Sequence, residues 1–337
     1  MYSAASQIAL RFVRWEDAPV DGEFWAARLD SALLRRERTG IAGPARRVVF
    51  AEADEWPGLI VDQYADCLSV QTLTPAADRL APEWTRLLVE RLGPRAVVAR
   101  NDLKVRRLEG LEAGVEVWHG EAPTPFPVAI GDRTFTVDLQ GGQKTGAFLD
   151  QQENYRAAAH HAAGAARALD AFAGEGGFAL HLASAVGEVE AIEISRGAAT
   201  RGEANAALNG IENVAWTVTN AFDRLHALDA EGARYGAIVL DPPAFAKNRR
   251  SVPAARRGYK EINLRALKLL EPGGILVTCS CSYHVRREEL LAIATGAAAD
   301  AGRTVELLEI RGQASDHPIL LNAPETEYLK CLVLRAR

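Results

Sequence analysis

The sequence is poor in cysteine and has no long apolar run. Its 337 residues include four cysteines, at positions 67, 279, 281 and 331, which are too few and too scattered for a disulfide framework. A reducing compartment fits best, so we expect a cytoplasmic protein. No apolar run approaches the roughly 20 residues of a membrane helix. The start, MYSAASQIALRF, lacks the basic-then-apolar order of a secretory signal.

The sequence also lacks an excess of positive charge. Lys and Arg number 39 against 44 Asp and Glu, which gives a net charge of -5. This excludes an overall basic coat for nucleic acid and leaves only local basic patches. No internal repeat or low-complexity tract is present. With 48% hydrophobic and 25% charged residues, the composition is typical of a globular protein, and the length favours one large or two moderate domains.

Residues 1–125 predict a small α+β domain. Hydrophobic periodicity indicates a helix at 24–38, two strands within 58–73, a helix at 82–91 with Pro82 in its first turn, and a strand at 96–100. Three prolines in EAPTPFP, residues 121–127, mark a boundary. A hairpin that turns at 131–132 is expected directly after it.

Residues 126–337 predict an α/β domain that this hairpin leads into. From about residue 165, short apolar strands alternate with helical stretches, and the chain ends in two strand-like segments, TVELLEIRG and EYLKCLVLR. The alternation is typical of a mostly parallel sheet with helices on both faces, to which the last segments add an antiparallel edge strand. Ligands of such sheets lie outside the carboxyl ends of the strands, so the residues after each strand are the candidates for a site.

Small and acidic residues follow the first strands of this domain. Gly174 and Gly176 stand between a predicted strand and a helix, where bare backbone and free N–H groups can approach a ligand. Glu193 ends the next strand and can accept hydrogen bonds from both hydroxyls of a ribose. Each feature alone is also explained by a tight turn or an exposed acid, but together they favour a nucleoside such as NAD or S-adenosylmethionine. Asn220, after the third strand, either caps a helix or contacts an adenine ring.

Asp241 ends an apolar strand and is followed by two prolines. Proline cannot continue a ladder of strand hydrogen bonds, so the pair holds the aspartate in a fixed pose. Asp-Pro-Pro at this position is typical of methyltransferases that act on nucleobases or related planar amino groups. A dehydrogenase has no evident use for it.

Two cysteines end the next strand, in TCSCSYH. Because side chains alternate, Cys279 and Cys281 are predicted on one face, with Cys281 nearer the carboxyl edge. A structural role suits Cys279, and a metal site is disfavoured because only His284 could add to the two thiols. A nucleophilic Cys281 explains the pairing with Asp241. A thiolate that adds to carbon 6 of cytosine activates carbon 5, and an acid near N3 and N4 stabilises the charge on the ring.

These motifs carry a family resemblance. GGQKTGAFLDQQENY, FAGEGGFAL, DPPAF, RRGYKEIN, CSCS and ASDHPIL resemble segments of the RlmI-type 23S rRNA cytosine-5 methyltransferases, over nearly the whole chain. The resemblance implies a Rossmann-like class I methyltransferase domain after a small α+β domain, with Cys281 as nucleophile and Asp241 as its partner. The match begins at the end of the family's N-terminal PUA domain, so we expect that domain to be absent, with residues 1–12 as a remnant.

The resemblance also implies the cofactor, S-adenosylmethionine, and its contacts. These are Lys144, Thr145, Gly146, Phe148, Phe172, Gly174, Gly176, Glu193, Ile194, Asn220 and Ala221. Asn220 stands where the family usually has an acid, and Cys279 where it more often has an aromatic residue.

The segment after Asp-Pro-Pro is basic and contains no acid up to residue 260. A solvated helix face explains most runs of charge, but this one follows the predicted catalytic aspartate and suits the phosphates around a flipped base. The predicted RNA contacts are Lys247, Arg249, Arg250, Arg256, Arg257 and Lys260.

The resulting prediction is methylation of carbon 5 of a cytosine in 23S rRNA, free or in a large-subunit precursor, through a covalent cysteine adduct. No metal or membrane partner is expected, and a homodimer is left open. A base-nitrogen methyltransferase acting on guanine or adenine is the first alternative. A nicotinamide-dependent dehydrogenase and a non-catalytic rRNA-binding protein are the others.

Overall fold

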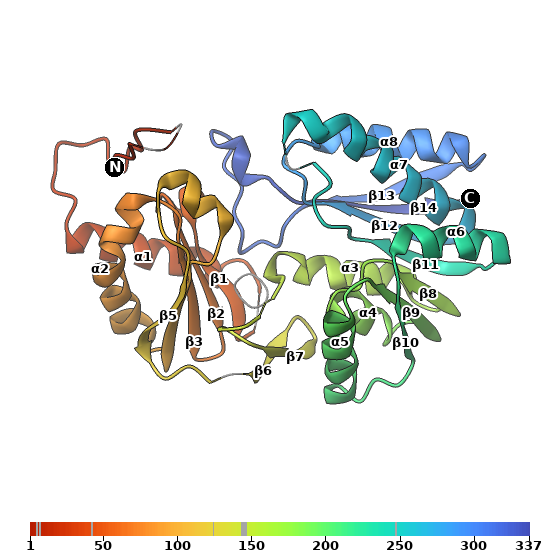
Figure 1. Cartoon of the computed structure of the whole chain (residues 1–337), viewed down its shortest axis with the longest axis horizontal. Coiled ribbons are helices and arrows are strands. Elements are labelled where there is room, and N and C mark those ends of the chain that lie inside the picture. Colours follow the sequence, from red (N-terminus) through yellow and green to blue (C-terminus); the bar gives the residue numbers. More distant parts are fainter. Residues whose placement is uncertain (5, 7, 42, 124, 143–146, 247) are drawn as a thin grey trace. The chain divides into compact units, whose positions relative to one another are not determined.

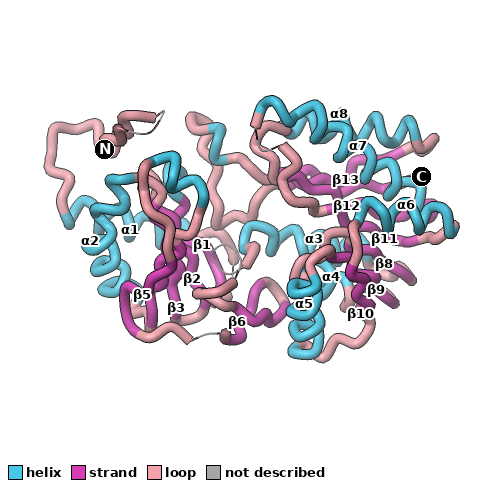
Figure 2. Tube along the Cα trace, viewed as in Figure 1, coloured by secondary structure: helices cyan, strands magenta, loops and turns pink. Residues whose placement is uncertain are grey.

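The computed structural model describes the chain except for residues 5, 7, 42, 124, 143–146 and 247 (Figures 1 and 2). The chain forms two compact units. The first comprises Met1–Ile130, Phe135–Leu149 and Ser315–Thr326, and the second Gly131–Thr134, Asp150–Ala314 and Glu327–Arg337.

The division differs from the boundary expected at residue 125. Strand β6, Phe126–Ile130, belongs to the first unit, and so does the late segment Ser315–Thr326. That segment returns because the Asp316 carboxylate accepts a hydrogen bond from the Arg47 N–H at 2.7 Å, while the Arg36 guanidinium donates to the Asp316 carbonyl at 2.8 Å. Such long-range partners are not visible in local sequence patterns.

The first unit contains a five-stranded sheet in the order β1-β2-β3-β4-β5. Its strands and helices are β1 Ala45–Phe50, β2 Leu59–Tyr64, β3 Cys67–Thr72, β4 Ala96–Arg100, β5 Val115–Gly120, α1 Gly22–Glu37 and α2 Pro75–Leu92. The hairpin partner of β6 is β7, Arg133–Val137. The core is built around Trp25, Trp56 and Trp84, whose rings pack with centroids 4.8–5.0 Å apart.

Helix α2 starts earlier than its sequence pattern predicts. Thr74 caps it by accepting the Ala77 N–H at 3.1 Å, and Pro75 occupies the first turn. Pro82 therefore lies inside the helix, where proline costs about 3 kcal/mol. Burial of Ala77 and Trp84 against the tryptophan core offsets that cost, so the prediction of a first-turn Pro82 was wrong.

The second unit contains a seven-stranded sheet in the order β10-β9-β8-β11-β12-β14-β13. Its strands are β8 Arg167–Asp170, β9 Glu188–Glu193, β10 Val214–Val218, β11 Tyr235–Leu240, β12 Leu270–Ser280, β13 Val305–Arg311 and β14 Lys330–Ala336. Strands β8 to β12 are parallel, and β14 pairs antiparallel with both β12 and β13. The antiparallel strand thus lies one place inside the edge. Strand β14 is buried along nearly its whole length, as expected of a strand that has neighbours on both sides and packed side chains on both faces. The edge strand β13 is half-exposed.

Helices cover both faces of this sheet (Figure 1). One face packs against α6 Ala221–Glu231, α7 Val252–Leu269 and α8 Arg287–Asp300. The other packs against α3 Gln152–Ala162 and α4 Gly177–Leu182, and α5 Arg196–Leu208 packs beside β9 and β10. The predicted alternation of strands and helices is confirmed, and it brings the carboxyl ends of β9, β8, β11 and β12 to one edge.

Candidate active site

The glycine loop after β8 forms an open cradle next to the carboxylate that ends β9. Gly174 and Gly176 have φ angles of +56° and +99°, which L side chains rarely adopt. Glu193 accepts the Gly174 N–H on Oε2 at 3.0 Å. A Cβ added to Gly174 would meet no atom within 4 Å, so bare backbone faces open space beside this carboxylate. This cradle fits the ribose of a nucleoside cofactor.

Asp170, which sequence reasoning missed, organises the same loop from beneath. Its carboxylate accepts the Ala179 N–H at 3.0 Å and the Phe172 N–H at 3.4 Å. Burial, followed by the nearby charge of Asp241, raises the pKa of Asp170 to about 7. An acid that ends the strand directly before a glycine loop was the available signal for this residue.

The remaining predicted cofactor residues have different environments. The Asn220 side chain accepts the Phe222 N–H at 2.8 Å and caps α6, so the helix-cap alternative is the arrangement present. Ala221 is buried in the first turn of α6, and Ile194 is 69% exposed. Phe172 is half-buried against the core under α6 to α8.

The block around residues 141–155 is only partly described. Lys144, Thr145 and Gly146 lie outside the described residues, and Phe148, 40% exposed, belongs to the first unit. Directly before α3, Asp150 Oδ2 accepts a hydrogen bond from the Tyr328 hydroxyl at 2.6 Å. Its Oδ1 is buried and has no hydrogen-bond partner among the described residues.

Cys281 lies just beyond the last residue of β12, and the other three cysteines are buried. Hydrogen bonds hold the residues on either side of it. The buried Ser280 and Ser282 hydroxyls contact the Tyr259 hydroxyl of α7 at 3.0 and 2.9 Å. Ser282 Oγ also accepts the Ala246 N–H at 3.1 Å. This bond ties the cysteine loop to the segment that follows Asp-Pro-Pro.

Cys279 has other surroundings than Cys281. It pairs with Cys331 across β12 and β14, and hydrogen bonding to that thiol, with burial, raises its pKa well above the ordinary value. Strand alternation ends at Ser280, so it does not determine where the Cys281 sulfur points. Because its raised pKa keeps the Cys279 thiol protonated, Cys279 is a poor nucleophile. This supports the assignment of Cys281 rather than Cys279.

Asp241 follows β11 and acts electrostatically on several neighbours. Its charge contributes to the raised pKa values of Tyr155, Asp170 and Cys279. Asp241 therefore belongs to the same strand-end cluster as the glycine loop and the cysteine strand. The fold places Asp241 near Asp170 beside the glycine loop and near Cys279 of the cysteine strand.

Part of the positive charge in the basic segment 247–260 is neutralised by carboxylates from elsewhere in the chain. Arg256 pairs with Glu289 of α8, and Lys260 with Asp300 at 2.7 Å. Arg250 and Arg257 are exposed and form no ion pair among the described residues. Lys247 lies outside the described residues, and only the backbone of Arg249 is described. An acid-free run of sequence is therefore not an acid-free surface, because α8 supplies carboxylates.

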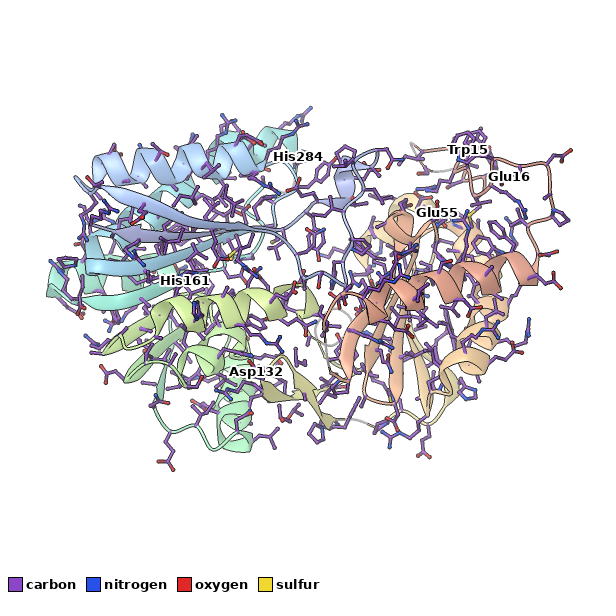
Figure 3. All side chains as sticks on the ribbon, turned by 180° about the vertical axis from the view of Figure 1, so that it is seen from behind. Trp15, Glu16, Glu55, Asp132, His161 and His284 are labelled. Atoms are coloured by element: carbon purple, nitrogen blue, oxygen red, sulfur yellow. The ribbon has the colours of Figure 1, made fainter. Side chains whose placement is uncertain are left out.

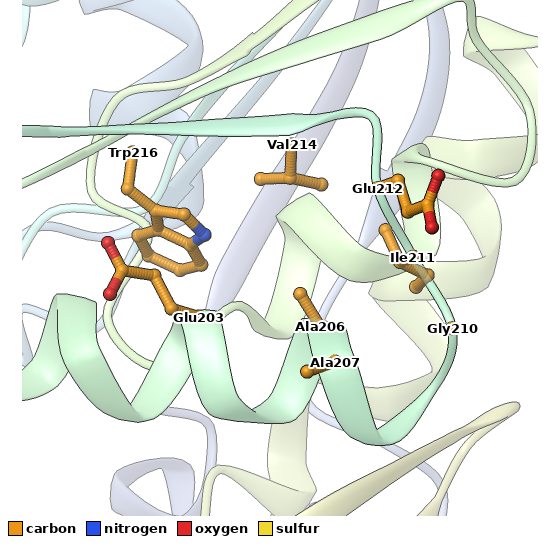
Figure 4. Close-up of a pocket in the computed structure, with 8 residues that line it drawn as sticks. All are labelled: Glu203, Ala206, Ala207, Gly210, Ile211, Glu212, Val214 and Trp216. Atoms are coloured by element: carbon orange, nitrogen blue, oxygen red, sulfur yellow. The ribbon is translucent and has the colours of Figure 1, made fainter.

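Two further features lie apart from this cluster. A pocket of about 390 Å³ is lined by residues including Gly210, Glu212 and Trp216 (Figure 4). It opens where β10 begins, away from the carboxyl ends of the strands. His284, labelled in Figure 3, packs edge-on against the Tyr283 ring. Within the described part of the chain, no group of three or more His, Cys, Asp or Glu is placed to hold a metal ion, and no helix could span a membrane.

Comparison with known proteins identifies the family. Residues 98–323 match the sequence model of the S-adenosylmethionine-dependent methyltransferases. Ribosomal RNA large subunit methyltransferase I of Aeromonas hydrophila is 39% identical over 347 residues, which cover 100% of this chain and 86% of the relative. The chain belongs to this methyltransferase family.

Solved structures show the same fold for this methyltransferase. A proposed SAM-dependent methyltransferase from Streptococcus mutans superposes with a TM-score of 0.83 at 16% identity, covering 96% of this chain and 84% of that one. A proposed methyltransferase complexed with SAH gives 0.81 at 17% identity, covering 95% and 83%. The Rossmann-like class I fold is confirmed. The cofactor is S-adenosylmethionine, which sets aside the nicotinamide-dependent dehydrogenase.

Proposed function

We propose that this methyltransferase methylates carbon 5 of a cytosine in 23S ribosomal RNA, in the cytoplasm, with Cys281 as a covalent nucleophile. The names of the relatives support ribosomal RNA of the large subunit as substrate. The finer assignment is carried by one observation. Cys281 is the cysteine that is not buried, and its loop is hydrogen-bonded to the segment after Asp241.

The chemistry divides between these residues. The Cys281 thiolate adds to carbon 6 of the cytosine, and the electrons of the 5,6 double bond make carbon 5 nucleophilic. Asp241 stabilises the charge on the ring from the side of N3 and N4. S-adenosylmethionine, when bound, supplies an electrophilic methyl group. Transfer of that group to carbon 5 leaves S-adenosylhomocysteine, and loss of the carbon-5 proton to solvent restores the double bond and expels the thiolate.

Trapping with 5-fluorocytosine RNA tests the nucleophile. Fluorine cannot leave as a proton does, so the protein stays bound to carbon 6 and the adduct survives denaturation. We expect the adduct in wild type and in Cys279→Ala, and its loss in Cys281→Ala. Cys279→Ala is the matched control because it removes the buried thiol of β12 and leaves the Cys281 thiol in place. An adduct that follows Cys279 contradicts the assignment.

A base-nitrogen methyltransferase is the second candidate, because Asp-Pro-Pro also serves nitrogen chemistry and nitrogen needs no thiol. In that case Cys281→Ala retains methylation and no adduct forms in any variant. Bisulfite sequencing of 23S rRNA from cells with and without the gene separates the two, since cytosine-5 methylation protects a cytosine from conversion and methylation of a guanine or adenine nitrogen does not.

A further inference from the structure

Lys330 is a buried lysine that the mechanism above does not use. It begins β14, is 3% exposed, and lies opposite Ser280 in the pairing of β14 with β12. Its Nζ donates to the carbonyl oxygens of Ser282 at 2.8 Å and Tyr328 at 3.0 Å. A buried ammonium is costly unless negative charge lies near it. Two neutral carbonyls only partly meet that need.

Cys281 is the neighbour that can carry the missing charge. The carbonyl that accepts the Lys330 N–H belongs to Ser282, the residue directly after Cys281. Burial lowers the pKa of Lys330 to about 8, while interaction with Cys281 and then with Glu327 opposes that shift. Lys330 also has a third N–H donor, for which the described residues provide no hydrogen-bond acceptor.

Tyr259 is a second titratable group that interacts with Cys281. Its hydroxyl is shared with Ser280 and Ser282, and burial raises its pKa, so it is uncharged at neutral pH. Glu327 lies nearer the surface and pairs with Arg287. Of Lys330, Tyr259 and Glu327, Lys330 is the group whose positive charge favours ionisation of the Cys281 thiol.

We propose that Lys330 is a positioning residue that holds the Cys281 sulfur as a thiolate near neutral pH. The inference rests on the proposed function, since it serves the role of Cys281 as nucleophile. Coulomb attraction from an ammonium favours the ionised thiol, and only the thiolate adds to carbon 6. Lys330 keeps its proton throughout, and the thiol proton passes to solvent before RNA binds.

The pH dependence of Cys281 alkylation tests this inference without RNA or cofactor. Iodoacetamide labels the native full-length protein at several pH values, and mass spectrometry of the Cys281 peptide gives the rate. We expect a wild-type midpoint below the ordinary thiol value of about 8.5. Lys330→Met should raise that midpoint by about one pH unit or more, and so slow labelling at pH 7 about tenfold. Lys330→Arg should restore the wild-type profile.

Two controls make the result specific. Lys268→Met removes a positive charge from a half-exposed position on α7, where Lys268 lies 4.0 Å from Asp229, and should leave the profile unchanged. Lys330→Gln keeps an amide donor for the Ser282 carbonyl and replaces Lys330→Met if that variant does not fold, as judged by circular dichroism. An unshifted midpoint in a folded, uncharged variant overturns the inference, as does a wild-type midpoint at or above about 8.5. The trapping experiment with 5-fluorocytosine RNA tests Cys281 as the nucleophile, and the alkylation profile tests Lys330. A failure of one proposal can therefore be told from a failure of the other.

Discussion

Two buried side chains of the second unit have pKa values that respond in opposite ways to pH. Asp170 is raised to about 7 by burial and then by Asp241, and His181 is lowered to about 4 by burial. Between about pH 4 and 7 the folded protein holds a proton on Asp170 that the unfolded chain releases, so this contribution to stability falls as pH rises. Over about pH 4 to 6.5 the unfolded chain protonates His181 and the folded protein does not, so this contribution rises with pH.

Single substitutions should separate these two contributions. In Asp170→Asn the free energy of unfolding should rise more steeply from pH 4 to 6.5 than in wild type, because the opposing contribution of Asp170 is gone. In His181→Gln it should rise less steeply than in wild type over the same range, because the opposing contribution of Asp170 remains. Each contribution has a limiting slope of about 1.4 kcal/mol per pH unit. Urea denaturation at several pH values measures this, and parallel curves for all three proteins contradict the assignment.

Glu193 should carry much of the cofactor affinity. Its carboxylate already receives the Gly174 and Ser195 N–H groups and, in the proposed contact, both ribose hydroxyls. Glu193→Gln should weaken S-adenosylhomocysteine binding by roughly 1.5–3 kcal/mol, or about ten- to over a hundredfold. Calorimetry measures the affinity, and Glu203→Gln on the exposed side of α5 is the matched control. Equal affinities for the two variants reject the ribose contact.

At the scale of elements, α7 links the catalytic loops to the proposed RNA surface. Its buried face supplies the Tyr259 hydroxyl that anchors the cysteine loop. Its exposed face carries arginines in two states, since Arg256 is paired with Glu289 and Arg257 forms no ion pair among the described residues. An exposed arginine without an ion-pair partner neutralises an RNA phosphate and so releases its counterion. An arginine already paired with a carboxylate does this less.

RNA binding should therefore depend on Arg250 and Arg257 more than on Arg256. Arg250→Ala with Arg257→Ala should weaken RNA binding and reduce its salt slope by about one unit for each lost phosphate contact. Arg256→Ala is the control and should change the slope less, because Glu289 already offsets its charge. Filter binding at several salt concentrations gives the slopes. If the double variant has the wild-type slope, the run is a solvated surface.

At the scale of the whole molecule, the cofactor should act as a stabilising ligand. S-adenosylhomocysteine at about 100 times its Kd should raise the free energy of unfolding by about 2.7 kcal/mol, because it binds only the folded state. Cys281→Ala should keep this gain, since the thiol is assigned to the base. Thermal denaturation followed by circular dichroism measures it. An equal gain in Glu193→Gln at the same ligand concentration contradicts the ribose assignment.

The sequence by itself determined the elements of the second unit from β8 onward and the order of its candidate residues, whereas helix α3 was not predicted. The hydrophobic periodicity of strands and helices is local, and the glycines, Asp241 and the cysteines mark strand ends by local rules. The parallel sheet then places those ends at one edge. The start of α2 also has a local signature, a capping Thr74 followed by Pro75, which the prediction of a helix start at Pro82 did not use.

Only the tertiary structure decided which of these residues have partners. Glu289 on Arg256, Cys331 beside Cys279, and Lys330 next to the Cys281 loop come from 33 to 52 residues away along the chain. Burial likewise sets the protonation of Asp170, whose neighbour Asp241 follows another strand, β11. Charge, desolvation and hydrogen bonding depend on distance in space, and a one-dimensional pattern carries no information about that distance once the chain has turned back on itself.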